Sequence, residues 1–226
     1  AIASLPQGYD IAILPEMFTT GFICKPEPAR DLAESMDGPT VGFLKKCAAE
    51  YNLALCGSFI AREDDRLFNR AFFIEPSGDE YYYDKRHLFS ISGEDAVYTR
   101  GDRPRPVFRF RGWNISMAVC FDLRFPAWLR NNSTNPYDLL IIMSNWPDSR
   151  ARAWQQLIIA RAIENQAYVA GCNCKGADDY GAYSGTSLII DPKGVDINEP
   201  FNDLITTATL SLNSLHTFRS KFPVLE

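Results

Sequence analysis

The stretch DLLIIMSNWPDSRARAWQQLIIARAIENQAYVAGCNC, residues 138–174, decides the fold class of this chain. Its first segment, residues 138–144, is an apolar run that predicts a fully buried strand. Residues 150–165 carry apolar side chains at helical spacing and predict a helix. Residues 167–174 predict a second strand. Strand, helix and strand in succession indicate a layered α/β domain.

The same alternation extends through the rest of the chain. An apolar run at 11–14 predicts a buried strand, and residues 41–51 predict a helix with Pro39 near its start. Further strands are predicted at 53–60, 70–75 and 113–120. No linker, low-complexity tract or block of charge divides the sequence, so we expect one domain spanning residues 1–226.

One short pattern occurs twice. Residues 72–78, FFIEPSG, and residues 188–194, LIIDPKG, each place a strand before an acidic residue and a Pro-x-Gly turn. Two ordinary hairpins explain the pattern, and so does a two-fold pseudo-repeat with one hairpin from each half. The residues alone favour the ordinary hairpins.

Composition excludes several classes of function. The 226 residues are 46% apolar and 23% charged, as in an ordinary globular protein. The net charge of −5, the pI near 5.2 and the lack of a Lys/Arg run argue against nucleic-acid binding. No apolar stretch is long enough to span a bilayer, and glycine-rich phosphate loops are missing, so the sequence predicts neither a membrane partner nor a nucleotide cofactor.

The cysteines and histidines exclude further classes. Six cysteines are dispersed through apolar segments without a CxxC pair, so we expect reduced thiols in a cytoplasmic protein rather than a disulfide scaffold. The chain begins at Ala1 without the pattern of a signal sequence. Its two histidines, His87 and His216, form no HxH or HExxH motif, and the sequence therefore predicts no metal site.

Polar residues with chemical potential follow three of the predicted strands. Glu16 follows the strand at 11–14, Cys120 ends the strand at 113–120, and Asn145 and Trp146 follow the strand at 138–144. In open α/β sheets, ligands bind beyond the carboxyl ends of the strands. The pattern therefore predicts the region of a site, although not its reaction.

Cys120 is the sharpest of these candidates. It ends a buried strand and precedes a helix that we expect to start at Asp122, and a helix N-terminus favours the thiolate. A cysteine in an apolar strand is more commonly a packed core residue. We accept that interpretation for the other five cysteines, but for Cys120 the neighbouring residues favour a nucleophile.

Glu16 and Lys85 are candidates with strong structural alternatives. Glu16 suits a general base if it is buried, and it equally suits a solvated loop acid or a helix cap. Lys85 lies in residues 83–89, YDKRHLF, which would ordinarily be a solvated charged turn. The flanking aromatic side chains indicate a packed loop instead, in which the ammonium would stabilise a developing oxyanion.

Three segments together resemble the signature blocks of the nitrilase, or carbon–nitrogen hydrolase, superfamily. They are residues 14–18 (LPEMF), 83–89 (YDKRHLF) and 119–126 (VCFDLRFP), and the order Glu, Lys, Cys and its spacing match the family pattern. Residues 144–147 (SNWP) and 161–168 (RAIENQAY) resemble the omega-amidase branch. Members of that branch remove ammonia from the side-chain amide of 2-oxo acids such as 2-oxoglutaramate.

The resemblance implies a fold and an assembly. The family fold is a four-layer α-β-β-α sandwich with pseudo-two-fold halves, and its members form homodimers or larger homo-oligomers. Family members also begin with a strand and a helix before the first glutamate. Only residues 1–8 precede Tyr9 here, so we expect that N-terminal strand to be missing from this sequence.

The resemblance also implies a set of site residues and no cofactor. Cys120 would attack the amide carbon, while Lys85 and the backbone N–H of Phe121 would hold the oxyanion of the intermediate. Glu16 would act as general base and acid, and a thioester would form. Glu94 matches a second glutamate that positions the substrate or the first pair, with a solvated loop acid as the alternative.

Substrate-binding residues are less sharply indicated. Arg86 and Arg124 adjoin the signature blocks and are candidates for the 2-oxo acid carboxylate, although Arg124 fits an ion pair on a helix equally well. Trp146 is a candidate pocket wall, with a core position as the alternative.

Three rival functions stay open at this stage. They are a superfamily amidase for deaminated glutathione, a carbamoyl amine or a nitrile; a catalytically silent scaffold; and a thiol redox protein. The intact Glu16, Lys85 and Cys120 disfavour the scaffold. The lack of a CxxC pair disfavours the redox protein.

Overall fold

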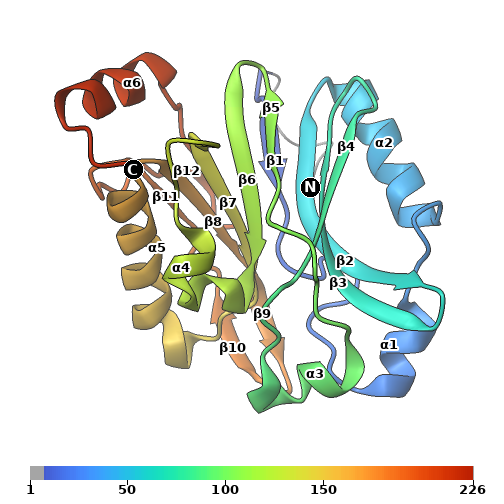
Figure 1. The fold of residues 1–226 in the computed structure, drawn as a ribbon. Helices are drawn as coiled ribbons and strands as arrows, with labels where there is room; N and C mark the ends of the chain where they lie inside the picture. Colours follow the sequence, from blue (N-terminus) through green and yellow to red (C-terminus); the bar gives the residue numbers. More distant parts are fainter. Residues whose placement is uncertain (1–7, 226) are drawn as a thin grey trace. The chain divides into compact units, whose positions relative to one another are not determined.

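The computed structural model describes residues 8–225. The chain divides into two compact units, Ala1–Pro104 and Arg105–Glu226, and each unit is built on its own β-sheet (Figure 1). The expected single domain of residues 1–226 stays a prediction. The expected lack of a first family strand concerns residues 1–8, of which 1–7 lie outside the described part.

The first unit contains a four-stranded sheet in the order β1-β2-β3-β4. Strand β1 is parallel to β2, and the β2–β3 and β3–β4 pairs are antiparallel. The strands are β1 (Ile11–Ile13), β2 (Ala54–Glu63), β3 (Arg66–Ile74) and β4 (Glu80–Asp84). The helices are α1 (Pro26–Leu32), α2 (Pro39–Tyr51), η2 (Ser90–Ser92) and α3 (Glu94–Val97).

Helix α2 covers one face of this sheet because its apolar residues recur every three or four positions. Val41, Leu44 and Ala48 are buried against alternate residues of the strands, among them Phe59 and Phe72. Intervening strand positions face the opposite side, where most of β2 and β3 is also buried. The residues that carry chemistry in this unit lie at the ends of the strands and on that second face.

The second unit contains a five-stranded sheet in the order β11-β8-β7-β6-β5. The three central strands are parallel, and the two edge strands are antiparallel to their neighbours. The strands are β5 (Val107–Phe110), β6 (Trp113–Val119), β7 (Leu139–Ser144), β8 (Tyr168–Asn173) and β11 (Leu188–Ile190).

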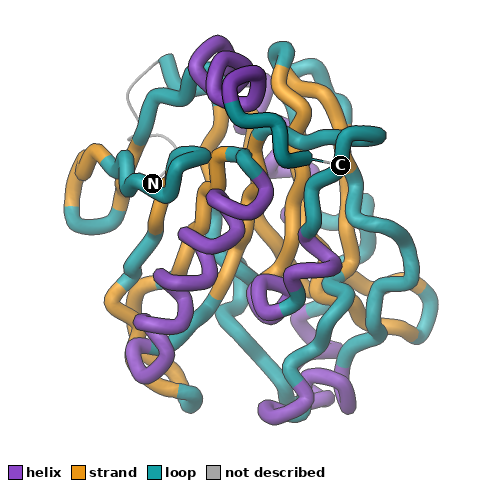
Figure 2. The backbone as a smooth tube through the Cα atoms, turned by 60° about the vertical axis from the view of Figure 1, so that its left-hand side comes forward, coloured by secondary structure: helices purple, strands orange, loops and turns teal. Residues whose placement is uncertain are grey.

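Helix α5 (Ala151–Asn165) joins β7 to β8 and lies along this sheet. Figure 2 shows purple helices lying along the orange strands. Trp154, Ile158 and Ala162 form its buried face and pack with Leu140 and Val169. The βαβ unit expected from residues 138–174 is therefore confirmed.

Shorter elements complete the second unit. They are η3 (Cys120–Arg124), α4 (Pro126–Leu129), η4 (Asp148–Arg150), the hairpin of β9 (Lys175–Asp178) and β10 (Gly181–Ser184), the hairpin of β12 (Glu199–Asn202) and β13 (Ile205–Thr207), and α6 (Leu212–Lys221). In the part of the chain that the structure describes, no helix is both long and apolar enough to cross a bilayer.

The structure differs from the sequence prediction near Asp122, where we expected a helix to start. A 3-10 turn begins at Cys120 itself, and the α-helical turn that follows starts only at Pro126. The Asp122 carboxylate accepts a hydrogen bond of 3.1 Å from the Val119 N–H, which closes the tight turn before a helix can form. Both segments are too short for a helix dipole to stabilise the Cys120 thiolate, so that part of the sequence argument does not hold.

The two Pro-x-Gly turns have the same hydrogen bonds. In each, the N–H of the acid, Glu75 or Asp191, donates to a carbonyl four residues later at 2.9 Å. The glycine N–H donates back to the carbonyl of that acid, at 3.0 Å for Gly78 and 2.9 Å for Gly194. Both glycines have positive φ, 95° and 87°. One turn lies in each unit, which favours the pseudo-repeat over two unrelated hairpins.

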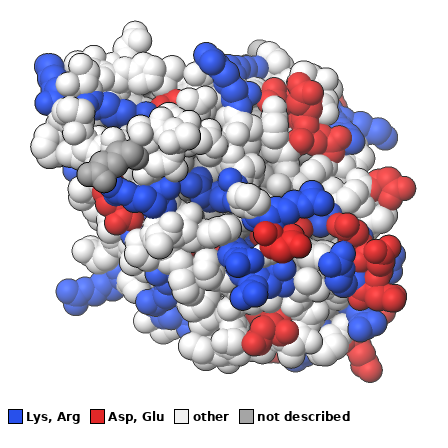
Figure 3. All heavy atoms as spheres, viewed as in Figure 1, with Lys and Arg blue, Asp and Glu red and all other residues white. Residues whose placement is uncertain are grey.

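Charged residues of both signs are interspersed on the face shown in Figure 3. No extended field of one sign covers that face. None of the six cysteines is in a disulfide.

Candidate active site

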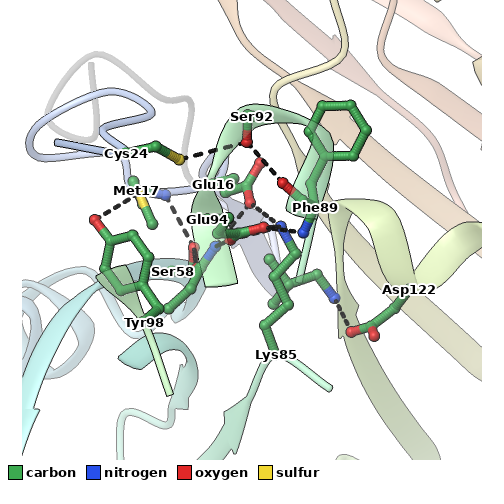
Figure 4. Close-up of polar contacts among 12 residues, drawn as sticks. Glu16, Met17, Cys24, Ser58, Lys85, Phe89, Ser92, Glu94, Tyr98 and Asp122 are labelled. Carbon is green, nitrogen blue, oxygen red and sulfur yellow. Dashed lines mark hydrogen bonds and ion pairs between the residues drawn. The ribbon is translucent and has the colours of Figure 1, made fainter. Parts of the chain in front are cut away.

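Three charged side chains meet in the interior of the first unit. The Lys85 ammonium lies 2.9 Å from Glu16 Oε1, and 2.9 and 2.8 Å from the two carboxylate oxygens of Glu94 (Figure 4). None of the three residues is more than 1% exposed. A buried cation is costly to desolvate, and here the two carboxylates that contact the ammonium compensate that cost.

The three side chains come from different elements of that unit. Glu16 lies just beyond β1, Lys85 follows β4, and Glu94 opens α3. The Lys85 N–H donates to the carbonyl of Asn69 at 3.0 Å, which extends the β3–β4 ladder by one residue. The Phe89 N–H donates to Glu94 Oε2 at 2.6 Å and fixes that carboxylate.

A left-handed residue follows Glu16. Met17 is fully buried and has φ 46°, a conformation that costs a residue with a Cβ about 1–2 kcal/mol. Its N–H donates to Ser58 Oγ at 2.9 Å, and its carbonyl accepts from the Gly21 N–H at 2.8 Å. The surrounding structure therefore holds the turn that presents Glu16, as strained turns at functional sites require.

The electrostatics of this cluster suit proton transfer. Burial is the main cause that raises the pKa of Glu94 above its usual range, and the nearby Glu16 charge raises it further. The Lys85 ammonium and the Phe89 N–H act in the opposite direction without cancelling the effect. Two carboxylates that share one cation in a buried site are a common arrangement for acid–base chemistry.

Sequence analysis missed Asn69 and Ser58, which belong to the same cluster. Asn69 Nδ2 donates to Glu16 Oε1 at 2.7 Å and to Glu94 Oε1 at 3.2 Å. Ser58 Oγ donates to Asn69 Oδ1 at 2.9 Å. The available signal was an asparagine among the apolar residues of a strand, because a buried amide needs hydrogen-bond partners.

Arg86 lies beside this cluster rather than within it. Its Nη1 donates to the Gly101 carbonyl at 2.8 Å, and its backbone N–H donates to the Tyr83 hydroxyl at 3.1 Å. The Gly101 N–H in turn donates to the Lys85 carbonyl at 3.0 Å. Arg86 therefore braces the backbone segment that packs against Lys85.

Cys120 lies in the second unit, directly after β6. It is half-buried and has φ 47°, so the chain turns sharply at the thiol itself. Cys47 and Cys56 are buried, whereas Cys24, Cys172 and Cys174 are half-buried like Cys120. Burial of its thiol raises the pKa of Cys172 to about 12. Among the six cysteines, all of which the structure describes, only Cys120 has a positive φ, so the strained turn sets it apart.

The remaining candidates of the second unit are Trp146, Arg124 and Phe121. Trp146 is 4% exposed and packs on Trp154 with ring centroids 5.8 Å apart. The exposed Arg124 places its guanidinium carbon 4.9 Å from the Trp146 ring centroid. Phe121 is half-buried and makes an edge contact with Phe125. Trp146 thus belongs to the core, and Arg124 covers its accessible side.

Asn173 fixes the backbone of Trp146. Its side-chain oxygen accepts from the Trp146 N–H at 2.7 Å, and its side-chain nitrogen donates to the Trp146 carbonyl at 2.9 Å. The indole Nε1 is buried and has no hydrogen-bond partner among residues 8–225.

Comparison with known proteins agrees with these motifs. The family model for carbon–nitrogen hydrolases matches residues 1–220. The chain is 43% identical over 223 residues to "Omega-amidase YafV" of Yersinia enterocolitica, covering 96% of this chain and 83% of that protein. It is 33% identical over 220 residues to "2-oxoglutaramate amidase" of Bacillus subtilis, covering 96% and 84%.

A solved structure agrees as well. XC1258 from Xanthomonas campestris, described as a CN-hydrolase superfamily protein with an arsenic adduct in its active site, matches with a TM-score of 0.86 and 42% identity. The match covers 95% of this chain and 82% of that protein. The nitrilase-type α/β fold expected from the sequence is confirmed.

Proposed function

The chain belongs to the carbon–nitrogen hydrolase family, and on this premise we propose that it is an omega-amidase. Its substrate is the side-chain amide of a small 2-oxo acid, 2-oxoglutaramate or 2-oxosuccinamate, which it hydrolyses to the acid and ammonia. Relatives named omega-amidase and 2-oxoglutaramate amidase support this substrate class. The observation that carries the proposal is the buried cluster of Glu16, Lys85 and Glu94.

In the first half of the reaction, Cys120 is the nucleophile. Glu16 takes the thiol proton while the sulfur bonds to the amide carbon. The ammonium of Lys85 and the backbone N–H of Phe121 hold the oxyanion of the tetrahedral species. Glu16 then delivers its proton to the amide nitrogen, the carbon–nitrogen bond breaks, and ammonia leaves behind a thioester on Cys120.

In the second half, Glu16 activates water. It takes one proton from the water as the oxygen bonds to the thioester carbon, and Lys85 again holds the oxyanion. The carbon–sulfur bond breaks, the 2-oxo diacid leaves, and the proton returns to the Cys120 thiolate. The proton that restores the thiol comes from the substrate water and no electrons are transferred, so the cycle needs no cofactor.

Glu94 serves this cycle through Lys85. The ammonium is drawn to both oxygens of Glu94 and to one oxygen of Glu16, so its position is fixed before substrate binds. A preorganised donor stabilises an oxyanion without the cost of reorganisation. Glu94 is therefore a positioning residue for Lys85, as the family resemblance implied.

Arg124 is the better candidate for the 2-oxo acid carboxylate. Its guanidinium is exposed and stacks on Trp146, whereas a guanidinium N–H of Arg86 donates a hydrogen bond to the Gly101 carbonyl. Arg124→Gln should lower kcat/KM for 2-oxoglutaramate by on the order of 10- to 100-fold, the loss of one charged hydrogen bond. The kcat/KM of Arg124→Gln for an uncharged amide substrate should fall far less. Equal losses for both substrates would mean that a residue other than Arg124 binds the carboxylate.

We also propose a cytoplasmic homo-oligomer that acts on a small molecule. The six free thiols support a reducing compartment. The acidic net charge and the mixed charges of Figure 3 support a protein without nucleic-acid or membrane partners.

The test is ammonia release from 2-oxoglutaramate, measured beside glutamine, deaminated glutathione and a simple nitrile, with Cys120→Ala as the control. We expect fast ammonia release from 2-oxoglutaramate by the parent and none by Cys120→Ala. Release of ammonia from another compound in the panel would change the substrate assignment but leave Cys120 as the nucleophile. Turnover by Cys120→Ala at the parent rate would overturn the mechanism.

A further inference from the structure

We infer that Asn69 is a positioning residue that holds the Glu16 carboxylate in place through Oε1 for proton transfer. The inference rests on the proposed role of Glu16 as general base and acid. It is carried by a chain of directed hydrogen bonds that runs from the backbone after Glu16 through Ser58 and Asn69 to the carboxylate itself.

The direction of each bond in this chain follows from the donors available. The Met17 N–H can only donate, so Ser58 Oγ accepts that bond, which is 2.9 Å long. The single hydroxyl proton of Ser58 is then free to point at the Asn69 side chain 2.9 Å away. The atom that receives it must be the amide oxygen, and the amide NH₂ therefore faces the acids.

The NH₂ group of Asn69 serves both acids at once. One N–H points at Glu16 Oε1 at 2.7 Å, and the other points at Glu94 Oε1 at 3.2 Å. Asn69 is 1% exposed, so water does not compete for these bonds. A neutral amide thus ties together two carboxylates that would otherwise repel each other.

Glu16 Oε1 also accepts a bond from the Lys85 ammonium at 2.9 Å. An ionised carboxylate oxygen has two lone pairs in its plane, and two donors already claim those of Oε1. Protonation of Oε1 would break one of the two bonds in a buried site, which is expensive. Asn69 and Lys85 therefore fix the orientation of the Glu16 carboxylate through one of its oxygens.

Ser58 secures the same glutamate from the backbone side. Its hydroxyl holds the N–H of Met17, whose left-handed conformation sets the direction in which the chain leaves Glu16. Ser58 and Asn69 lie on neighbouring strands of the sheet, β2 and β3. The carboxylate and the adjacent peptide are thus held by one rigid element, as accurate placement of a catalytic group requires.

The test compares three variants with the parent enzyme. Asn69→Asp keeps the shape but turns a donor into an acceptor; its kcat for 2-oxoglutaramate should fall on the order of 100-fold, with KM within about threefold. The acidic limb of its pH profile of kcat/KM should move to higher pH. The lost N–H donor and the added negative charge both favour protonated carboxyl groups in the cluster. Ser58→Ala, which keeps the amide donors, should lose about 10-fold in kcat.

Asn131→Asp is the matched control. Asn131 is equally buried and makes three side-chain hydrogen bonds, but all of its partners are backbone groups. This variant should lose stability while its folded fraction keeps the parent pH profile. Asn69→Asp with the parent kcat and acidic limb, or with losses that only follow stability as in the control, would overturn the inference.

A crystal structure of Asn69→Asp separates this inference from the proposed function. The Glu16 carboxyl group should turn so that Oε1 no longer lies within hydrogen-bond distance of both Lys85 and residue 69. If the parent releases no ammonia from any amide, the proposed function fails, and the positioning role is judged on this structure alone. An unmoved Glu16 would reject the positioning role whatever the substrate.

Discussion

The Lys85 ammonium lies within hydrogen-bond distance of both carboxylate oxygens of Glu94, and neither side chain is exposed to solvent. The pair makes the stability of the protein depend on pH. Because the pKa of Glu94 is raised above its ordinary value of 4.5, the native state retains a proton that the unfolded chain releases. Its contribution to stability is present at low pH and is lost as pH rises from 4.5 through the raised value.

The first prediction follows from this linkage. Glu94→Gln cannot titrate, so the free energy of unfolding of the parent should decline relative to that of the variant as pH rises above 4.5. Urea unfolding at several pH values between 4.5 and 8 measures the difference. Exposed Glu199→Gln controls for the loss of one negative charge. A parent and a Glu94→Gln variant with parallel curves would show that Glu94 is not the group responsible.

The second prediction concerns removal of the cation. Lys85→Met leaves two buried carboxylates without their ammonium, so unfolding should become easier by about 3–5 kcal/mol. The same change removes the oxyanion donor and should lower kcat by on the order of 100- to 1,000-fold. Urea titration and steady-state kinetics measure the two effects. Adding Glu94→Gln should restore part of the stability and none of the activity; a double variant no more stable than Lys85→Met would contradict the charge argument.

The third prediction concerns the backbone beside Lys85. A Cβ at Gly101 would lie 2.1 Å from the carbonyl oxygen of Asp84, which is backbone and cannot move aside alone. Gly101→Ala should therefore displace the segment with Lys85, destabilise the protein by about 1–3 kcal/mol and lower kcat by about 10- to 100-fold. Thermal unfolding and ammonia release measure the two effects.

Gly42→Ala is the matched control for that variant. Gly42 lies inside α2, where an added Cβ meets no heavy atom within 4 Å. Alanine favours a helix, so this variant should gain about 0.5–1 kcal/mol and keep parent activity. A Gly101→Ala variant as active as the control would mean that the Lys85 segment adapts to the added methyl group.

Sequence predicted the elements that bury apolar side chains in a regular pattern. The strand at 138–144 and the helix at 150–165 were found to within a residue as β7 and α5, because long periodic segments carry a strong signal. Strands β2 and β3 extend further than predicted, to Glu63 and from Arg66. Their exposed charged ends lack the alternation on which the prediction relied.

The sequence predicted the site residues whose type alone suggests chemistry. It did not predict the features that depend on how the chain folds around them. Glu16, Lys85 and Glu94 were expected from a resemblance, and the structure brings them together. Asn69 was missed because one asparagine in a strand has no pattern of its own. The turn at Cys120 was misjudged because one carboxylate, that of Asp122, closes it locally, which no periodicity reveals.

The last prediction concerns how α6 is held to the second unit. Arg219 on this helix pairs with Asp138 at 2.7 Å and donates to the carbonyls of Gln166 at 2.8 Å and Tyr137 at 2.7 Å. Of the helix residues, only Leu215 is buried, so polar contacts contribute much of the docking. Arg219→Ala should lower the free energy of unfolding by about 2–4 kcal/mol, because it leaves the nearly buried Asp138 without its cation.

Hydrogen exchange makes this prediction specific to α6. Amides of Leu212–Lys221 should lose protection in Arg219→Ala well before those of the central strands. Arg219→Lys should recover only part of the loss, since one ammonium cannot reproduce a planar fork that reaches three acceptors. Exposed Arg152→Ala on α5 is the control and should stay within about 0.5 kcal/mol of the parent. Equal protection of α6 in all three variants would mean that apolar contacts, not Arg219, dock the helix.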